Sequence, residues 1–240
     1  MRYKLELSYK GTAYCGWQRQ PNAMTVQEKI ENALSLLLRQ DISITGCGRT
    51  DTGVHASHYV AHFDFEGSLK PDFVYHLNCV LPEDICIKKN EHTSDDFHAR
   101  FNAKNREYTY KLLVEKNPFL RELTWQYRMD LDINKMNIAA SYLLIFNDFE
   151  TFSKVGSDNK TTLCKVTKAH WKRQDNTLTF TICADRFLRN MVRSIVGTLV
   201  DVGRGKISPQ DFKKILESKD RSKASSSAAA QGLYLSKIEY

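Results

Sequence analysis

The stretch GCGRTDTGVHA, residues 46–56, holds three glycines, one arginine and one aspartate and has almost nothing to bury. The segments on either side, 42–45 and 59–65, are predicted strands, so the stretch is a loop between them. Its glycines are not spaced as GxGxxG and no GK[ST] follows, which excludes both common nucleotide-binding fingerprints. Two interpretations remain: a long turn in which Asp51 makes turn hydrogen bonds, or a loop that presents Asp51 as a nucleophile.

The nucleophile interpretation rests on what a reactive carboxylate needs. It must be ionised, open to the substrate and held still, as in retaining glycosidases. The neighbouring guanidinium of Arg49 favours the charged form. Glycines allow the backbone to approach a bulky ligand closely.

Working outward, strands and helices follow in a similar order in the two halves of the chain. Alternating apolar residues predict strands at 3–9, 106–115 and 233–239, and a hairpin at 165–184 with its turn near 174–176. Capping residues predict helices that begin after Thr25, Asp132 and Ser208, one that starts at Pro71, and an apolar helix over 187–202 capped by Asp185. We therefore expect an α+β fold of two lobes, 1–104 and 105–240, with residues 222–230 as a flexible loop.

Composition narrows the class of protein. Charged residues make up 26% and hydrophobic residues 42% of the 240 residues, as in ordinary globular proteins. No apolar run reaches the length of a membrane helix, and the alternating N-terminus does not resemble a signal peptide, so we expect a cytoplasmic protein without membrane contact. The six cysteines are scattered, which predicts free thiols rather than disulfides or a zinc site.

The formal net charge of +7 is compatible with a nucleic-acid partner. Basic and aromatic residues interleave, most clearly in FHARF, residues 97–101, which can contact phosphates and stack on bases. The apolar helix carries Arg189 and Arg193, and a buried arginine there needs an anionic partner, for which Asp51 is a candidate. The set His55, His58 and His62 resembles a metal site, but a strand through 59–65 separates His55 from the others and argues against one.

Taken together, several stretches resemble the tRNA pseudouridine synthase A family. They are YKLELSYKGTAYCGWQRQ, TVQEKIENALS, GRTDTGVHA, FHARFNAKNREYTY, FLRNMVRSIVGTLVDVG and GLYL, which span the chain. The resemblance implies the pseudouridine synthase fold, with two ferredoxin-like or RRM-like lobes, a mixed but mostly antiparallel sheet and flanking helices around a central RNA-binding cleft. It also implies a homodimer that isomerises uridine at positions 38, 39 and 40 in the tRNA anticodon stem-loop, without metal or organic cofactor.

The resemblance also assigns roles to residues. Asp51 matches the catalytic nucleophile, Arg193 the arginine paired with it, and Tyr108 the tyrosine that stacks on the target base. Arg49 matches the arginine that helps to extrude the base, and Leu233 an apolar residue that lines the pocket. The expected RNA contacts are Phe97, His98, Ala99, Arg100 and Phe101, with Lys154, Asn159 and Lys160 in the loop after Phe152.

The chain departs from the family pattern at a few positions. Cys47 and Thr52 stand where alanine is more common, and both are small enough to predict little effect. Residues 225–230 replace a segment that often carries a proline, which predicts a looser loop. Two other classes of protein explain part of the pattern: an RNA-binding protein without catalytic activity, and a glycoside hydrolase, although the loop offers one carboxylate where that chemistry normally uses two.

Overall fold

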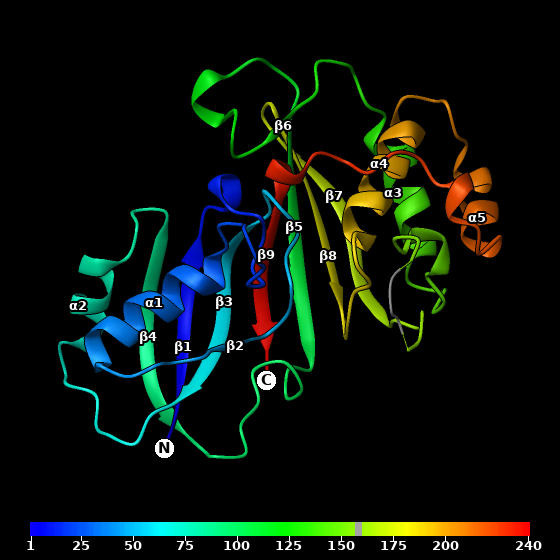
Figure 1. Ribbon diagram of the computed structural model, residues 1–240. Helices are drawn as coiled ribbons and strands as arrows, with labels where there is room; N and C mark the ends of the chain where they lie inside the picture. Colours follow the sequence, from blue (N-terminus) through cyan, green and yellow to red (C-terminus); the bar gives the residue numbers. More distant parts are fainter. Residues whose placement is uncertain (157–159) are drawn as a thin grey trace. The chain divides into compact units, whose positions relative to one another are not determined.

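The computed structural model describes residues 1–156 and 160–240, which form nine strands and five α-helices (Figure 1). They fall into two compact units, Met1–Lys104 with Tyr234–Tyr240, and Asn105–Leu233. Most strand pairs are antiparallel, and the class is α+β, as the sequence predicts. The last strand follows the second unit in the chain, yet residues 234–240 belong to the first.

The first unit is a sheet with two helices. Its strands lie in the order β4-β1-β3-β9, with the short β2 beside β3, and only the β3–β9 pair is parallel. The elements are β1 (Arg2–Tyr9), α1 (Val26–Leu38), β2 (Thr45–Gly46), β3 (His55–Asp64), α2 (Phe73–Val80), β4 (Ile85–Thr93) and β9 (Leu233–Glu239). In β1 every second side chain is buried, which confirms the predicted half-buried strand. Thr25 Oγ1 accepts a hydrogen bond from the backbone of Glu28 and caps α1, as the capping box predicts.

The second unit packs three helices beside an antiparallel sheet. Its strands lie in the order β5-β8-β7, with β6 parallel to β5, and α3, α4 and α5 contact one another (Figure 1). The elements are β5 (Asn105–Leu113), β6 (Trp125–Gln126), α3 (Ile133–Tyr142), β7 (Val166–Gln174), β8 (Thr177–Ala184), α4 (Met191–Gly203) and α5 (Pro209–Glu217). The predicted hairpin and the caps Asp132 and Ser208 are all present.

The predicted apolar helix begins later than the sequence suggests. Asp185 does not cap it, because its carboxylate accepts hydrogen bonds from the backbone of Lys165 and Arg186. The helix starts only after Asn190, whose left-handed φ of 64° turns the chain into α4. Arg189 therefore lies before the helix, and the prediction that the helix carries both Arg189 and Arg193 is wrong for Arg189.

Two other expectations need correction. Residues 42–44 are not a strand, while β3 extends back to His55 because this end of β3 pairs with the distant β9. The segment 222–230 is not a free loop. It contains 3₁₀ turns and buries Ala224 and Ala228.

All six cysteines are free thiols, and burial raises the pKa of Cys164 to about 12. Within the two described ranges, no helix has both the length and the apolar character needed to cross a bilayer.

Candidate active site

The loop that carries Asp51 is short and closed at both ends by β structure. Because β2 ends at Gly46 and β3 begins at His55, the loop comprises eight residues, 47–54. At its start Cys47 donates its backbone N–H to Val60 O at 2.9 Å, and at its end Val54 donates to Asp51 O at 3.1 Å. The second bond forms a turn directly after the aspartate, with Gly53 at a φ of 76° that suits glycine.

A second segment, residues 9–17, holds the backbone on both sides of Asp51. Before it, Thr50 Oγ1 and Tyr9 Oη share a buried hydrogen bond of 2.7 Å, and Trp17 donates its N–H to Thr50 O at 3.3 Å. After it, Gly53 donates its N–H to Tyr14 O at 3.3 Å. The aspartate is thus fixed by contacts with residues more than 30 positions away in the chain.

Two glycines allow this close contact. A Cβ on Gly11 would lie 2.0 Å from Val54 O, and a Cβ on Gly16 would lie 2.3 Å from Thr50 O. Both distances are far below van der Waals contact, so a side chain at either position would displace the loop. Gly16 also has a left-handed φ of 84°. The motif KGTAYCGW, residues 10–17, therefore packs against the Asp51 loop and holds its backbone in place. The sequence alone does not predict this role.

Aromatic rings form the floor beneath the loop. Trp17 stacks on Tyr59 with ring centroids 4.0 Å apart, Tyr9 packs against both, and all three rings are buried. Tyr59 Oη donates a hydrogen bond to Gly48 O inside the loop. Next to these buried rings, Asp51 is half-buried and Arg49 is exposed.

The three histidines near the loop have structural roles. Nδ1 of each accepts a backbone N–H: His55 from Gly11 at 2.9 Å, His58 from Ile238 at 3.3 Å and His62 from Ala99 at 3.1 Å. Burial lowers the pKa of His58 and, to about 4, that of His62, so these rings stay neutral acceptors. Among the side chains that the structure describes, no three His, Cys, Asp or Glu gather in an arrangement that could hold a metal ion.

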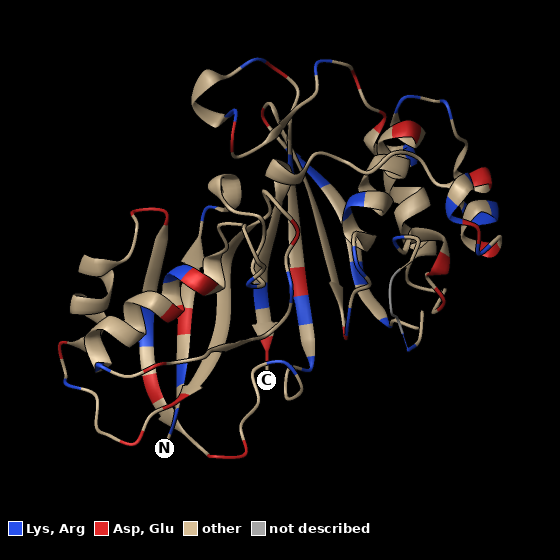
Figure 2. Ribbon diagram, viewed as in Figure 1, with Lys and Arg blue, Asp and Glu red and all other residues tan. Residues whose placement is uncertain are grey.

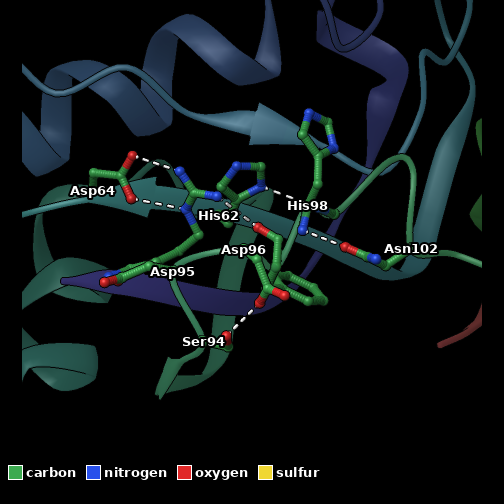
Figure 3. A network of polar contacts seen from close by, with 10 residues as sticks. His62, Asp64, Ser94, Asp95, Asp96, His98 and Asn102 are labelled. Atoms are coloured by element: carbon green, nitrogen blue, oxygen red, sulfur yellow. Dashed lines mark hydrogen bonds and ion pairs between the residues drawn. The ribbon is translucent and has the colours of Figure 1, made fainter.

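The segment 97–101 is anchored through this histidine network (Figure 3). Arg2 donates to Phe97 O at 2.9 Å and forms a two-point ion pair with Asp64. Nδ1 of His98 accepts the backbone N–H groups of Arg100 and Phe101, and the rings of His98 and Phe101 lie 4.2 Å apart. Phe101 is 75% exposed, and the guanidinium of Arg100 lies 5.6 Å from the centre of its ring. An aromatic ring and a cation therefore lie side by side at the surface.

The second unit carries the other predicted catalytic residues. Tyr108 lies on β5, where its half-buried ring meets Phe187 edge-on at 5.1 Å. Arg193 lies in the first turn of α4, and its Nε donates a hydrogen bond to Ala228 O at 2.8 Å. Leu233 is buried at the start of β9. The predicted site residues thus come from both units, with Asp51 and Arg49 in the first and these three in the second.

The predicted RNA contacts after Phe152 are only partly described. Lys154 and Lys160 are exposed, and Lys154 donates its backbone N–H to Arg189 O at 3.1 Å. Asn159 lies outside the described residues.

Comparison with known proteins gives one consistent result. The family described as tRNA pseudouridine synthase matches residues 7–102 and 139–240. A protein of Bacteroides fragilis named tRNA pseudouridine synthase A is 50% identical over all of this chain and 96% of its own length. Proteins of the same name from Bacteroides thetaiotaomicron and Acetivibrio thermocellus are 47% and 43% identical, over 100% and 99% of this chain and 90% and 98% of their own lengths.

Proposed function

This chain belongs to the tRNA pseudouridine synthase family and is an isomerase of tRNA uridines, and we propose that it modifies positions 38, 39 and 40 of the anticodon stem-loop with Asp51 as the nucleophile. The observation that carries the proposal is the clamped loop. A half-buried carboxylate stands on a backbone that is hydrogen-bonded immediately before and after it. Such preorganisation is what a nucleophile needs and what an ordinary surface turn lacks.

The reaction breaks the N1–C1′ bond of uridine, turns the uracil and forms a C5–C1′ bond. C5 releases its proton and N1 takes up one from solvent, so the product is an isomer of the substrate. No electrons pass to an acceptor and no phosphoryl group moves, so the isomerisation itself calls for no nicotinamide or nucleotide. Asp51 attacks either C1′ of the ribose or C6 of the base, and both routes end in the same product. Asp51 and Tyr108 are the two candidates for removing the C5 proton.

The other predicted site residues each have a role in the proposed reaction. Extruding the uridine from its stack costs a few kcal/mol, and stacking on Tyr108 returns about 1–3 kcal/mol. Arg49, exposed beside the nucleophile, fills the space that the base leaves. Arg193 pairs with Asp51 and keeps it ionised and aimed. Leu233 supplies an apolar wall for the uracil.

RNA binding draws on a surface of mixed charge. Figure 2 shows acidic and basic residues together on many elements, so the net charge of +7 is spread rather than gathered on one strand or helix. Segment 97–101, Lys154 and Lys160 supply phosphate and base contacts, and binding weakens steeply as salt rises. The proposal includes a homodimer and a cytoplasmic location, which the resemblance and the composition suggest.

The proposal is tested by release of tritium from tRNA labelled at uracil C5. The wild-type protein should release tritium and leave pseudouridine, whereas Asp51→Asn and Asp51→Ala should release none and still bind tRNA. Asp41→Asn, which alters an exposed carboxylate upstream of the loop, serves as the matched control and should keep full activity. Turnover by either Asp51 variant would exclude the nucleophile role. Binding without release by the wild type would indicate an RNA-binding protein, and free uracil a glycoside hydrolase.

A further inference from the structure

The segment Ala224–Ala229, ASSSAA, forms a strap along α4. Its side chains are all small, so its backbone comes close to the helix. The sequence predicts a loose loop here, yet every residue from 225 to 229 contacts α4, the residue that precedes α4, or β5. Two of these contacts join Ala228 to Arg193.

The strap covers a stripe of polar and small residues on a mostly apolar helix. The stripe consists of Arg193, Ser194, Gly197 and Thr198, spaced by three and four positions, which places them on one face of α4. At its far end Thr198 Oγ1 accepts the backbone N–H of Ser225 at 3.1 Å and donates to Ser194 O at 2.9 Å. The hydroxyl therefore links the start of the strap to the helix backbone.

Gly197 sets the distance between strap and helix. A Cβ at this position would lie 2.0 Å from Ser226 O and 3.1 Å from its carbonyl carbon. The obstacle is backbone, which cannot turn aside as a flexible side chain can. Any residue larger than glycine must push the strap away from α4 by more than 1 Å before normal contact is reached.

The strap and Arg193 hold each other by two hydrogen bonds. Ala228 donates its N–H to Arg193 O at 2.9 Å, and Arg193 Nε donates to Ala228 O at 2.8 Å. Because Nε lies in the plane of the guanidinium, this second bond fixes the direction of the planar fork. A free arginine side chain samples many rotamers, and here the bond to the backbone of Ala228 has already restricted them.

Two further bonds fix the strap on either side of Ala228. Asn190 Nδ2 donates to Ser227 Oγ at 2.6 Å, and Tyr110 Oη donates to Ala229 O at 2.8 Å. Tyr110 is fully buried, and burial raises its pKa, so the phenol keeps the proton that it donates. The carbonyl that orients Arg193 is therefore held by its neighbours in the chain.

We propose that the strap is a positioning element for catalysis, which aims the Arg193 guanidinium through Ala228 O, and that Gly197 and Thr198 are positioning residues because they set the place of the strap. This inference rests on the proposed role of Arg193 in pseudouridine formation. It assigns a function to residues that touch neither the uridine nor Asp51 in the proposed scheme.

The test measures single-turnover tritium release and tRNA affinity separately for each variant. Gly197→Ala should lower the rate constant by about 10–100-fold, since a displacement near 1 Å is enough for such a loss, and leave the Kd for tRNA within twofold. Thr198→Val should lower the rate constant in the same way, and Thr198→Ser should restore it because the hydroxyl is kept. Ser226→Ala should match the wild type, because Ser226 contributes only its backbone carbonyl and its side chain is exposed.

Wild-type rates in both Gly197→Ala and Thr198→Val would overturn the inference. So would a parallel loss of rate, tRNA affinity and Tm, which is the mark of general destabilisation. Failure of the proposed function has a different signature, since the wild-type protein itself would then form no pseudouridine. Wild-type turnover in Arg193→Ala would remove the role of Arg193, and the inference with it.

Discussion

Thr50 and Tyr9 share a buried hydrogen bond of 2.7 Å between their hydroxyl groups, one residue before Asp51. Tyr9 is the last residue of β1 and Thr50 lies in the loop, so this polar contact ties the loop of the proposed nucleophile to the first strand of the chain. Neither hydroxyl lies open to water, and a buried hydroxyl that loses its partner costs about 1–3 kcal/mol.

We expect Thr50→Ala to lower the free energy of unfolding by about 1–3 kcal/mol, because it removes the buried hydrogen bond between the two hydroxyl groups. It should also lower the rate of tritium release. Thr50→Ser keeps the oxygen and should retain most of both quantities. Urea unfolding and single-turnover assays measure the two effects. If Thr50→Ala behaves like Thr50→Ser, the hydrogen bond does not hold the loop.

Gly11→Ala should displace the loop from its other side. The added Cβ would lie 2.0 Å from Val54 O, so the turn after Asp51 must move. We expect the rate constant to fall by about 10–100-fold with little change in tRNA affinity. Thr12→Ala, at the exposed neighbouring position, is the control. Equal rates for Gly11→Ala and the control would contradict the close-contact argument.

Two substitutions of Tyr108 distinguish stacking of its ring from hydrogen bonding by its hydroxyl group. Tyr108→Phe keeps the ring and should preserve tRNA affinity, whereas Tyr108→Ala should lose about 1–3 kcal/mol of binding free energy. Filter binding at fixed salt measures both variants. Equal affinities of the two variants would exclude the stacking role.

His62 should make the protein less stable in mild acid. Its folded pKa of about 4 lies below the ordinary histidine value of 6.5, so the unfolded chain binds the extra proton first. The free energy of unfolding should therefore fall as pH drops from 6.5 to about 4, by about 1–3 kcal/mol from this residue, with the full contribution present above pH 6.5.

The variant His62→Asn keeps an acceptor for the Ala99 N–H and does not titrate, so its unfolding free energy should change less over this pH interval. His170→Asn, at an exposed position, should follow the wild-type slope. Urea unfolding at a series of pH values gives the comparison. A wild-type slope in His62→Asn would exclude His62 as the source.

Local patterns in the sequence predict the second unit well. The strand β5, the hairpin of β7 and β8, and the caps Asp132 and Ser208 depend on neighbours within a few residues, and all are present, although β5 ends at Leu113 and its burial does not alternate throughout. The sequence does not predict where α4 starts. The turn before the helix depends on the left-handed backbone of Asn190, which no nearby sequence pattern requires.

The candidate site is harder to predict, because its geometry depends on contacts between distant segments. The sequence indicates Asp51 as a candidate nucleophile, but not the segment 9–17 that clamps its loop. The start of β3 at His55 depends on β9, almost 180 residues later. The small residues of the strap predict a flexible loop. In the structure, the same small residues allow the strap to lie against Gly197.

The parallel pairing of β9 with β3 has a consequence for synthesis of the protein. Most of the first unit is synthesised before the second. It lacks β9 until residues 234–240 are made, on the order of ten seconds after Lys104. The second unit, continuous in the chain, can complete its sheet earlier. The unit that carries the Asp51 loop is therefore completed after the second unit, and until then the β3 edge at His55 and Ala56 lacks its partner strand.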